Sequence, residues 1–124
     1  MSAPRRTPPG WPDRVPPPDS PDWQVPATSW LLDHCPADYR GYEGWRKHPV
    51  ALAWITTRHI EAQLEAMRSA YRDVRVDLGD LVPAEALPEI LADLEAEGLR
   101  LRASARAASL LYDAMQGRRY IPRL

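Results

Sequence analysis

Mostly hydrophobic side chains recur at alternating spacings of three and four residues along two long stretches of the chain. The first set comprises Val50, Ala53, Thr57, Ile60, Leu64, Met67, Tyr71, Val74 and Leu78, and the second comprises Leu87, Leu91, Leu94, Gly98, Leu101, Ala105, Ala108, Tyr112 and Met115. This spacing keeps side chains on one face of a helix. It therefore predicts two long helices, one over 49–78 and one from Pro83 or Pro88 to about residue 116.

The two seams match each other if the chain folds back near residue 82. Antiparallel pairing then sets a large residue against a small one at successive levels: Met67 against Gly98, Ile60 against Ala105 and Ala53 against Tyr112. Close packing favours such pairs, so leucine at position 98 should overpack the seam. The flanking positions of this coiled-coil register bring together opposite charges, Glu61 with Arg102 and Arg68 with Glu95. The sequence thus predicts an all-α fold built on a long antiparallel helical hairpin.

An arm rich in proline precedes the helices. Residues 1–27 hold nine of the 14 prolines, which favours an extended or disordered chain. Two indoles in this arm, Trp11 and Trp23, are too apolar to remain in water without cost. We expect at least Trp23 to dock on the helices or on a partner, and we count both as candidate partner-binding residues.

A short third helix should follow the arm. Thr28 or Ser29 is a suitable N-cap for a helix over 30–35, which Pro36 would stop. Residues 40–48 read as a loop because two glycines interrupt any period.

Apolar residues off the seam gather near the open end of the hairpin: Leu52, Trp54, Ile55, Ala107, Leu110, Leu111 and Ala114. The short helix should cover part of this surface, and a homodimer or a partner helix the rest. The expected organisation is an arm over 1–27, a helical bundle over 28–117 and a basic tail over 118–124.

Composition excludes several classes of function. Sixteen basic and 17 acidic residues give a net charge of −1, so no global field attracts nucleic acid or acidic lipid. The single cysteine allows no internal disulfide and is typical of a reducing compartment. We see no secretory signal and no apolar run of membrane-spanning length, so a cytoplasmic protein that does not enter membranes is expected.

Residues 39–48 are the densest candidate site, because aromatic rings alternate there with cations: Arg40, Tyr42, Trp45, Arg46 and Lys47. Stacking combined with phosphate contacts suits single-stranded nucleic acid or a nucleotide. The same residues also suit an ordered connection whose rings plug the bundle end. The tail residues Arg118 and Arg119 could extend a basic surface or dock on a partner.

No catalytic, metal or cofactor motif stands out. His34 and Cys35 are adjacent, and His48 and His59 are 11 residues apart, which is not ligand spacing. Glu61 and Glu65 share a helix face, but arginines one turn later make a solvated ion-pair stripe the simpler explanation. We therefore predict a non-enzymatic helical protein–protein interaction or scaffolding module without cofactors. The alternative is a nucleic-acid or nucleotide-associated protein acting through the 39–48 segment and the basic tail.

Overall fold

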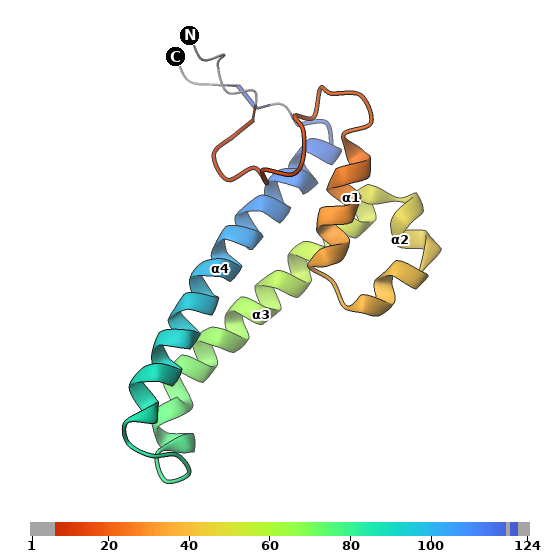
Figure 1. Ribbon diagram of the computed structural model, residues 1–124. Helices are drawn as coiled ribbons and strands as arrows, with labels where there is room; N and C mark the ends of the chain where they lie inside the picture. The colour runs from red at the N-terminus through yellow and green to blue at the C-terminus, as the bar shows by residue number, and fades with distance from the viewer. Residues whose placement is uncertain (1–6, 119, 122–124) are drawn as a thin grey trace.

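The protein is described by a computed structural model over residues 7–118 and 120–121, and the regular structure of this part is entirely helical (Figure 1). In chain order the elements are α1 (Gln24–Asp33), the 3-10 helix η1 (Ala37–Gly41), α2 (Glu43–Lys47), α3 (Pro49–Leu78) and α4 (Ala86–Met115). The helices α3 and α4 lie antiparallel and pack against each other, which confirms the predicted all-α hairpin.

The hairpin is held by the predicted seam. Pro49 occupies the first turn of α3, where a missing N–H leaves no donor unpaired. Midway along the hairpin, Ile60 and Leu64 of α3 cluster with Leu101 and Ala108 of α4. At the far end, the amides of residues 81 and 82 both donate to the Leu78 carbonyl and turn the chain toward α4.

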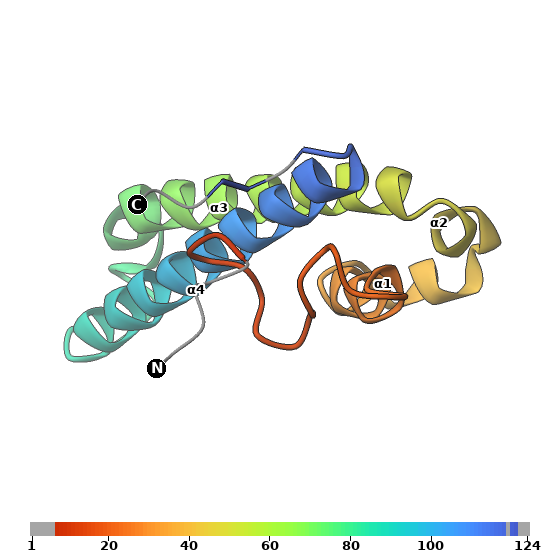
Figure 2. The same cartoon turned by 90° about the horizontal axis from the view of Figure 1, so that it is seen from above.

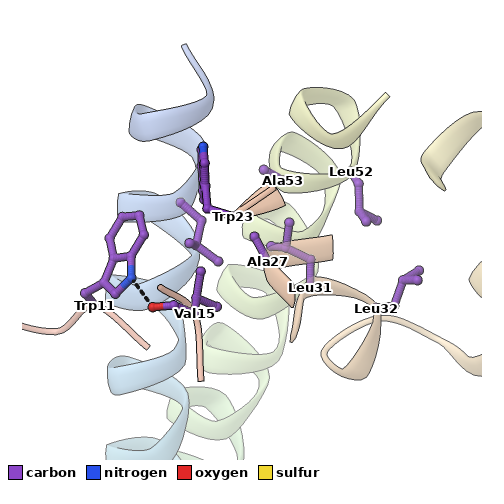
Figure 3. Packing of buried hydrophobic residues seen from close by; sticks show 9 residues of the cluster. Trp11, Val15, Trp23, Ala27, Leu31, Leu32, Leu52 and Ala53 are labelled. Carbon is purple, nitrogen blue, oxygen red and sulfur yellow. Dashed lines mark hydrogen bonds between the residues drawn. The ribbon is translucent and has the colours of Figure 1, made fainter. Parts of the chain in front are cut away.

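At the open end the hairpin is covered by α1 and by the arm (Figures 1 and 2). We call this end the head. Its core is a cluster of buried side chains from the arm, α1, α3 and α4: Trp11, Val15, Trp23, Ala27, Leu31, Leu32, Leu52, Ala53 and Leu111 (Figure 3). The rings of Trp11 and Trp23 have centroids 5.9 Å apart. The Trp11 indole N–H donates to the Val15 carbonyl over 2.8 Å, so this buried donor is paired.

The prediction that Trp23 docks on the helices is therefore confirmed, and Trp11 docks with it. They retain only 8% and 9% exposure, respectively. As predicted, Leu31 and Leu32 cover the apolar surplus of the hairpin, since they are buried against Leu52. The arm covers a further part of this surface, and Trp54 stays 42% exposed.

The arm passes α4 at close range near Gly10. This glycine has a φ of +95°, a conformation that side chains rarely adopt. A Cβ atom here would lie 2.7 Å from Cγ of Arg106. The Arg106 Nε donates to the Pro9 carbonyl over 3.4 Å. Glycine therefore permits the arm to reach α4.

Two local predictions are wrong. The short helix begins at Gln24 rather than near Ser29, and so it starts inside the predicted arm. Pro26 does not prevent this, because it occupies the first turn, where amide donors have no helical acceptor. Residues 40–48 are not a loop either, since η1 and α2 occupy most of them. Glycine alone does not stop such single turns when they pack against a larger helix.

Candidate functional site

Beyond the head, the hairpin consists of two helices without a third layer (Figure 1). We call residues 64–102 the tip half. Its surface includes apolar side chains that stay in water: Leu99 is 65% exposed, Val76 85% and Leu81 76%. The head also leaves large apolar groups in water: Val25 is 70% exposed, Tyr42 54%, and Val50 and Trp54 42% each. The Trp54 ring lies 4.8 Å below the Arg58 guanidinium. Apolar surface is therefore exposed in the tip half as well as at the end that the sequence predicted.

A groove of about 570 Å³ opens between α3 and α4 in the tip half. It is lined by apolar and charged residues from both helices: Leu64, Met67, Arg68, Tyr71, Arg72, Leu94, Glu95, Gly98, Leu99 and Arg102. We refer to this set as the tip groove.

Gly98 opens the tip groove because it carries no side chain. A Cβ built on Gly98 meets no atom within 4 Å, so the predicted tight contact with Met67 is wrong. Gly98 lies at the side of the seam, and Met67 stays partly exposed beside it. A leucine at position 98 would project into open space rather than overpack the hairpin.

Charged groups surround the apolar floor of the tip groove. Arg68 and Arg72 lie 3.6 and 3.9 Å from carboxylate oxygens of Glu65, all on α3. The Tyr71 hydroxyl donates to Glu95 of α4 over 2.9 Å, and this bond raises the pKa of Tyr71. The phenol thus stays protonated and bridges the two helices.

The predicted cross-helix ion pairs do not form. Arg68 pairs with Glu65 one turn earlier, and Glu95 accepts the Tyr71 hydroxyl instead of an arginine. Local pairs on one helix need less ordering of long side chains than pairs across a groove. Arg102 thus remains a cation at the groove edge.

The aromatic rings of residues 39–48 pack on one another and on α3. Tyr39 stacks on Trp45 with centroids 5.4 Å apart and planes 3° apart. Its hydroxyl shares a 2.8 Å hydrogen bond with Nε2 of His59. Tyr42 is 54% exposed and tilts against Tyr39 at 5.8 Å. Two of these rings thus plug the base of the head and do not present open faces for bases.

Most cations of the same segment have partners within the chain. Arg40 pairs with Asp33 and also donates to the Leu32 carbonyl at the end of α1. Lys47 pairs with Glu43 at 3.2 Å, one turn earlier on α2. Arg46 is exposed. The segment therefore forms a local ion-pair surface.

The remaining predicted site residues lie apart from this segment. Arg118 pairs with Asp113 at 3.1 Å, and its amide donates to the Asp113 carbonyl, so it terminates α4. Arg119 lies outside the described residues. Trp11 and Trp23 are buried in the head.

The fold brings together one cluster that the sequence did not suggest. A pocket of about 310 Å³ is lined by residues of α1, α3 and α4 and of the α1–η1 connection: Asp33, His34, Cys35, Pro36, His59, Ile60, Gln63, Arg100 and Leu101. No sequence spacing links His34 to His59, because α1 and α3 meet only in the tertiary structure. Among residues 7–118, 120 and 121, no three His, Cys, Asp or Glu side chains form a group that could hold a metal ion.

The chemistry of this pocket does not favour a reactive cysteine. The Thr56 hydroxyl donates to the Leu52 carbonyl at 2.7 Å, so it can accept the Cys35 S–H at 3.1 Å. Burial raises the pKa of Cys35, and the contacts with Thr56 and Arg40 oppose this only in part. The side chain is therefore a neutral thiol, which is a poor nucleophile.

Comparisons with known proteins leave the site to be judged on its geometry. No protein-family model matches the chain, and searches of curated proteins and of solved structures also find no match. Within the described part of the chain, no helix combines the length and the apolar character needed to cross a membrane.

Proposed function

We propose that the chain is a non-enzymatic helical interaction module that binds a helix in the tip groove. The observation that carries this proposal is an apolar groove left open between two long helices, with Leu99 65% exposed at its edge. Contiguous apolar surface of this kind marks interaction sites on small proteins.

The groove has the form that helix recognition uses. Two antiparallel helices with a depression between them accept a further helix, whose side chains at i, i+3, i+4 and i+7 enter the depression. Adding helices across the pair would complete a bundle, which is the usual way in which such a hairpin buries its remaining apolar face. Gly98 widens the depression at its centre, where a partner side chain would enter.

Site-specific photo-crosslinking tests the proposal. A photoreactive phenylalanine analogue at position 99 should give one discrete covalent product in cells, because Leu99 would lie under the bound helix. The control is the same analogue at Val25 in α1, which is 70% exposed but far from the tip groove along the fold. Equal and diffuse labelling at positions 99 and 25 would contradict the proposal.

A further inference from the structure

We infer that the helical partner of the tip groove is the hairpin of a second copy of this chain, related by a twofold axis at the level between Gly98 and Leu99. This inference rests on the proposed function of the groove. In the resulting dimer each hairpin lies antiparallel to the other, so that α3 faces α3 of the second copy and α4 faces its α4. Four helices then enclose both grooves.

The charges along α3 favour this arrangement. Arg68 and Arg72 line the tip groove. Glu61 and Glu65 precede them toward the head, and the helical spacing places them on the same face of α3. All four are exposed. An antiparallel pair of these segments sets each carboxylate opposite an arginine: Glu61 faces Arg72 of the second copy, and Glu65 faces its Arg68.

The charges along α4 reverse at the same level. Glu95 and Arg102 both line the tip groove and lie at equal distances from the midpoint between Gly98 and Leu99. The Tyr71–Glu95 hydrogen bond sets the register of the hairpin, so this midpoint lies beside residues 67 and 68 of α3. The midpoint of the α3 charges, between residues 66 and 67, is one residue away, a rise of about 1.5 Å along the helix. One axis therefore satisfies the charge patterns of both helices to within one residue.

The same axis also fits the shape of the groove. It brings Leu99 of one copy over Gly98 of the other, where no atom would obstruct a side chain within 4 Å of the glycine Cβ position. Leu99 is the groove residue with the largest exposed apolar fraction, and it would be buried twice, once from each copy. A large residue thus meets a small one across the interface.

The distribution of acidic groups favours the antiparallel over the parallel dimer. Between residues 73 and 97 the chain has eight carboxylates and one arginine. A parallel dimer would stack these two acidic tips on each other, which repels. The antiparallel dimer places them at opposite ends of the bundle.

Sedimentation of the full chain tests whether the second copy is bound. The wild type should sediment as a dimer at micromolar concentration, and Leu99→Asp should sediment as a monomer with unchanged helicity by circular dichroism. The matched control, Val25→Asp, changes an equally exposed apolar residue of the head and should remain dimeric. A monomeric wild type would overturn the inference.

Charge reversal tests the axis itself. Glu61→Arg and Arg72→Glu should each weaken the dimer about tenfold or more, because each replaces two equivalent ion pairs by repulsive ones. An equimolar mixture of these two variants should form a heterodimer with affinity near that of the wild type. Within one chain the two positions are about 16 Å apart along α3, so no intrachain contact explains such rescue. Asp73→Arg makes the same charge change as Glu61→Arg on another face of α3 and should leave the dimer intact.

The outcomes separate the alternatives. Failure of the mixture to associate, or rescue of Glu61→Arg by Arg102→Glu instead, would overturn the antiparallel axis, since a parallel dimer sets residue 61 near residue 102. A product of twice the chain mass from the analogue at position 99 supports this inference. A product containing a different protein would overturn the inference while leaving the proposed function standing.

Discussion

Gly10 and Gly117 are the two glycines with positive φ among the described residues, and they differ in what surrounds them. A Cβ on Gly10 would lie 2.7 Å from the side chain of Arg106, whereas a Cβ on Gly117 would meet nothing within 4 Å. Gly117→Ala therefore measures the cost of backbone strain alone. Gly10→Ala measures the same strain together with a steric clash between the arm and α4.

We predict that Gly10→Ala lowers the free energy of unfolding by about 1–3 kcal/mol, because alanine at positive φ is strained and its methyl displaces the Arg106 stem. Gly117→Ala should cost less. Thermal melts of the two variants provide the measurement. An equal cost would show that the arm does not press on α4 at Gly10.

Cys35 gives the stability a dependence on alkaline pH. Burial raises the pKa of its thiol in the folded chain. Below the ordinary thiol pKa both states are protonated and the group contributes no pH dependence. As the pH rises past that value, the unfolded chain ionises first, so the free energy of unfolding should fall. Urea titrations at increasing pH should show this fall in the wild type and a smaller one in Cys35→Ser. A steeper fall in the variant would contradict the prediction.

At the scale of elements, the arm acts as part of the core although it has no regular secondary structure before α1. Trp11 is buried in a cluster that also contains Leu52 of α3 and Leu111 of α4, which lie 41 and 100 residues later in the chain. Pro-rich composition predicts an extended backbone, and that does not exclude docking, because a stiff chain loses little entropy when it binds.

We predict that Trp11→Ala costs about 3–5 kcal/mol of unfolding free energy, as for other buried aromatic residues. Trp54→Ala should cost less than half of this, because Trp54 is 42% exposed. Chemical denaturation followed by circular dichroism measures both. Similar costs would indicate that the arm detaches from the head in solution.

The bounds of α3 and most of α4 follow from the spacing of apolar residues, since a continuous seam can be read without tertiary information. The start of α1 could not be found this way, because Pro26 suggests an interruption that the first turn tolerates. The tip groove was also missed. The seam pattern predicts that the two helices pack equally closely along their whole length. In the sequence, only the glycine at seam position 98 indicates a gap between them.

Gly98→Ala should therefore raise stability, in contrast to the overpacking that the seam pattern predicts. A methyl group at position 98 meets no atom and improves helix propensity by about 0.5–1 kcal/mol. Thermal melts at submicromolar concentration, where the proposed dimer is dissociated, give the value for the single chain. A lower melting temperature would mean that the helices close over this level.

On the scale of the whole molecule, packing is unequal from end to end. The head has four contributing segments around one cluster, whereas the turn near Leu81 joins two helices whose side chains are mostly exposed or half-buried. The free energy of local unfolding should therefore be lowest at the turn.

Hydrogen exchange should show this gradient. We predict that amides of residues 74–90 exchange faster than those of 52–60 and 104–111, although all three ranges include helical residues. Mass spectrometry of peptides from a labelled sample provides the measurement. Uniform protection along α3 and α4 would contradict the description of an end that is held by two helices only.

The hydrogen bond from Arg106 to the Pro9 carbonyl joins residues 97 positions apart and has a consequence for synthesis. The ribosome makes the arm before α4, at about 5–20 residues per second, so the arm waits about 5–20 s for its docking surface. During that time the two indoles of the arm lack the α4 side chain, Leu111, with which they are buried. The entropy cost of closing this loop grows only with the logarithm of its length, so the long separation adds little to it. The head therefore completes its folding only after α4 has been made.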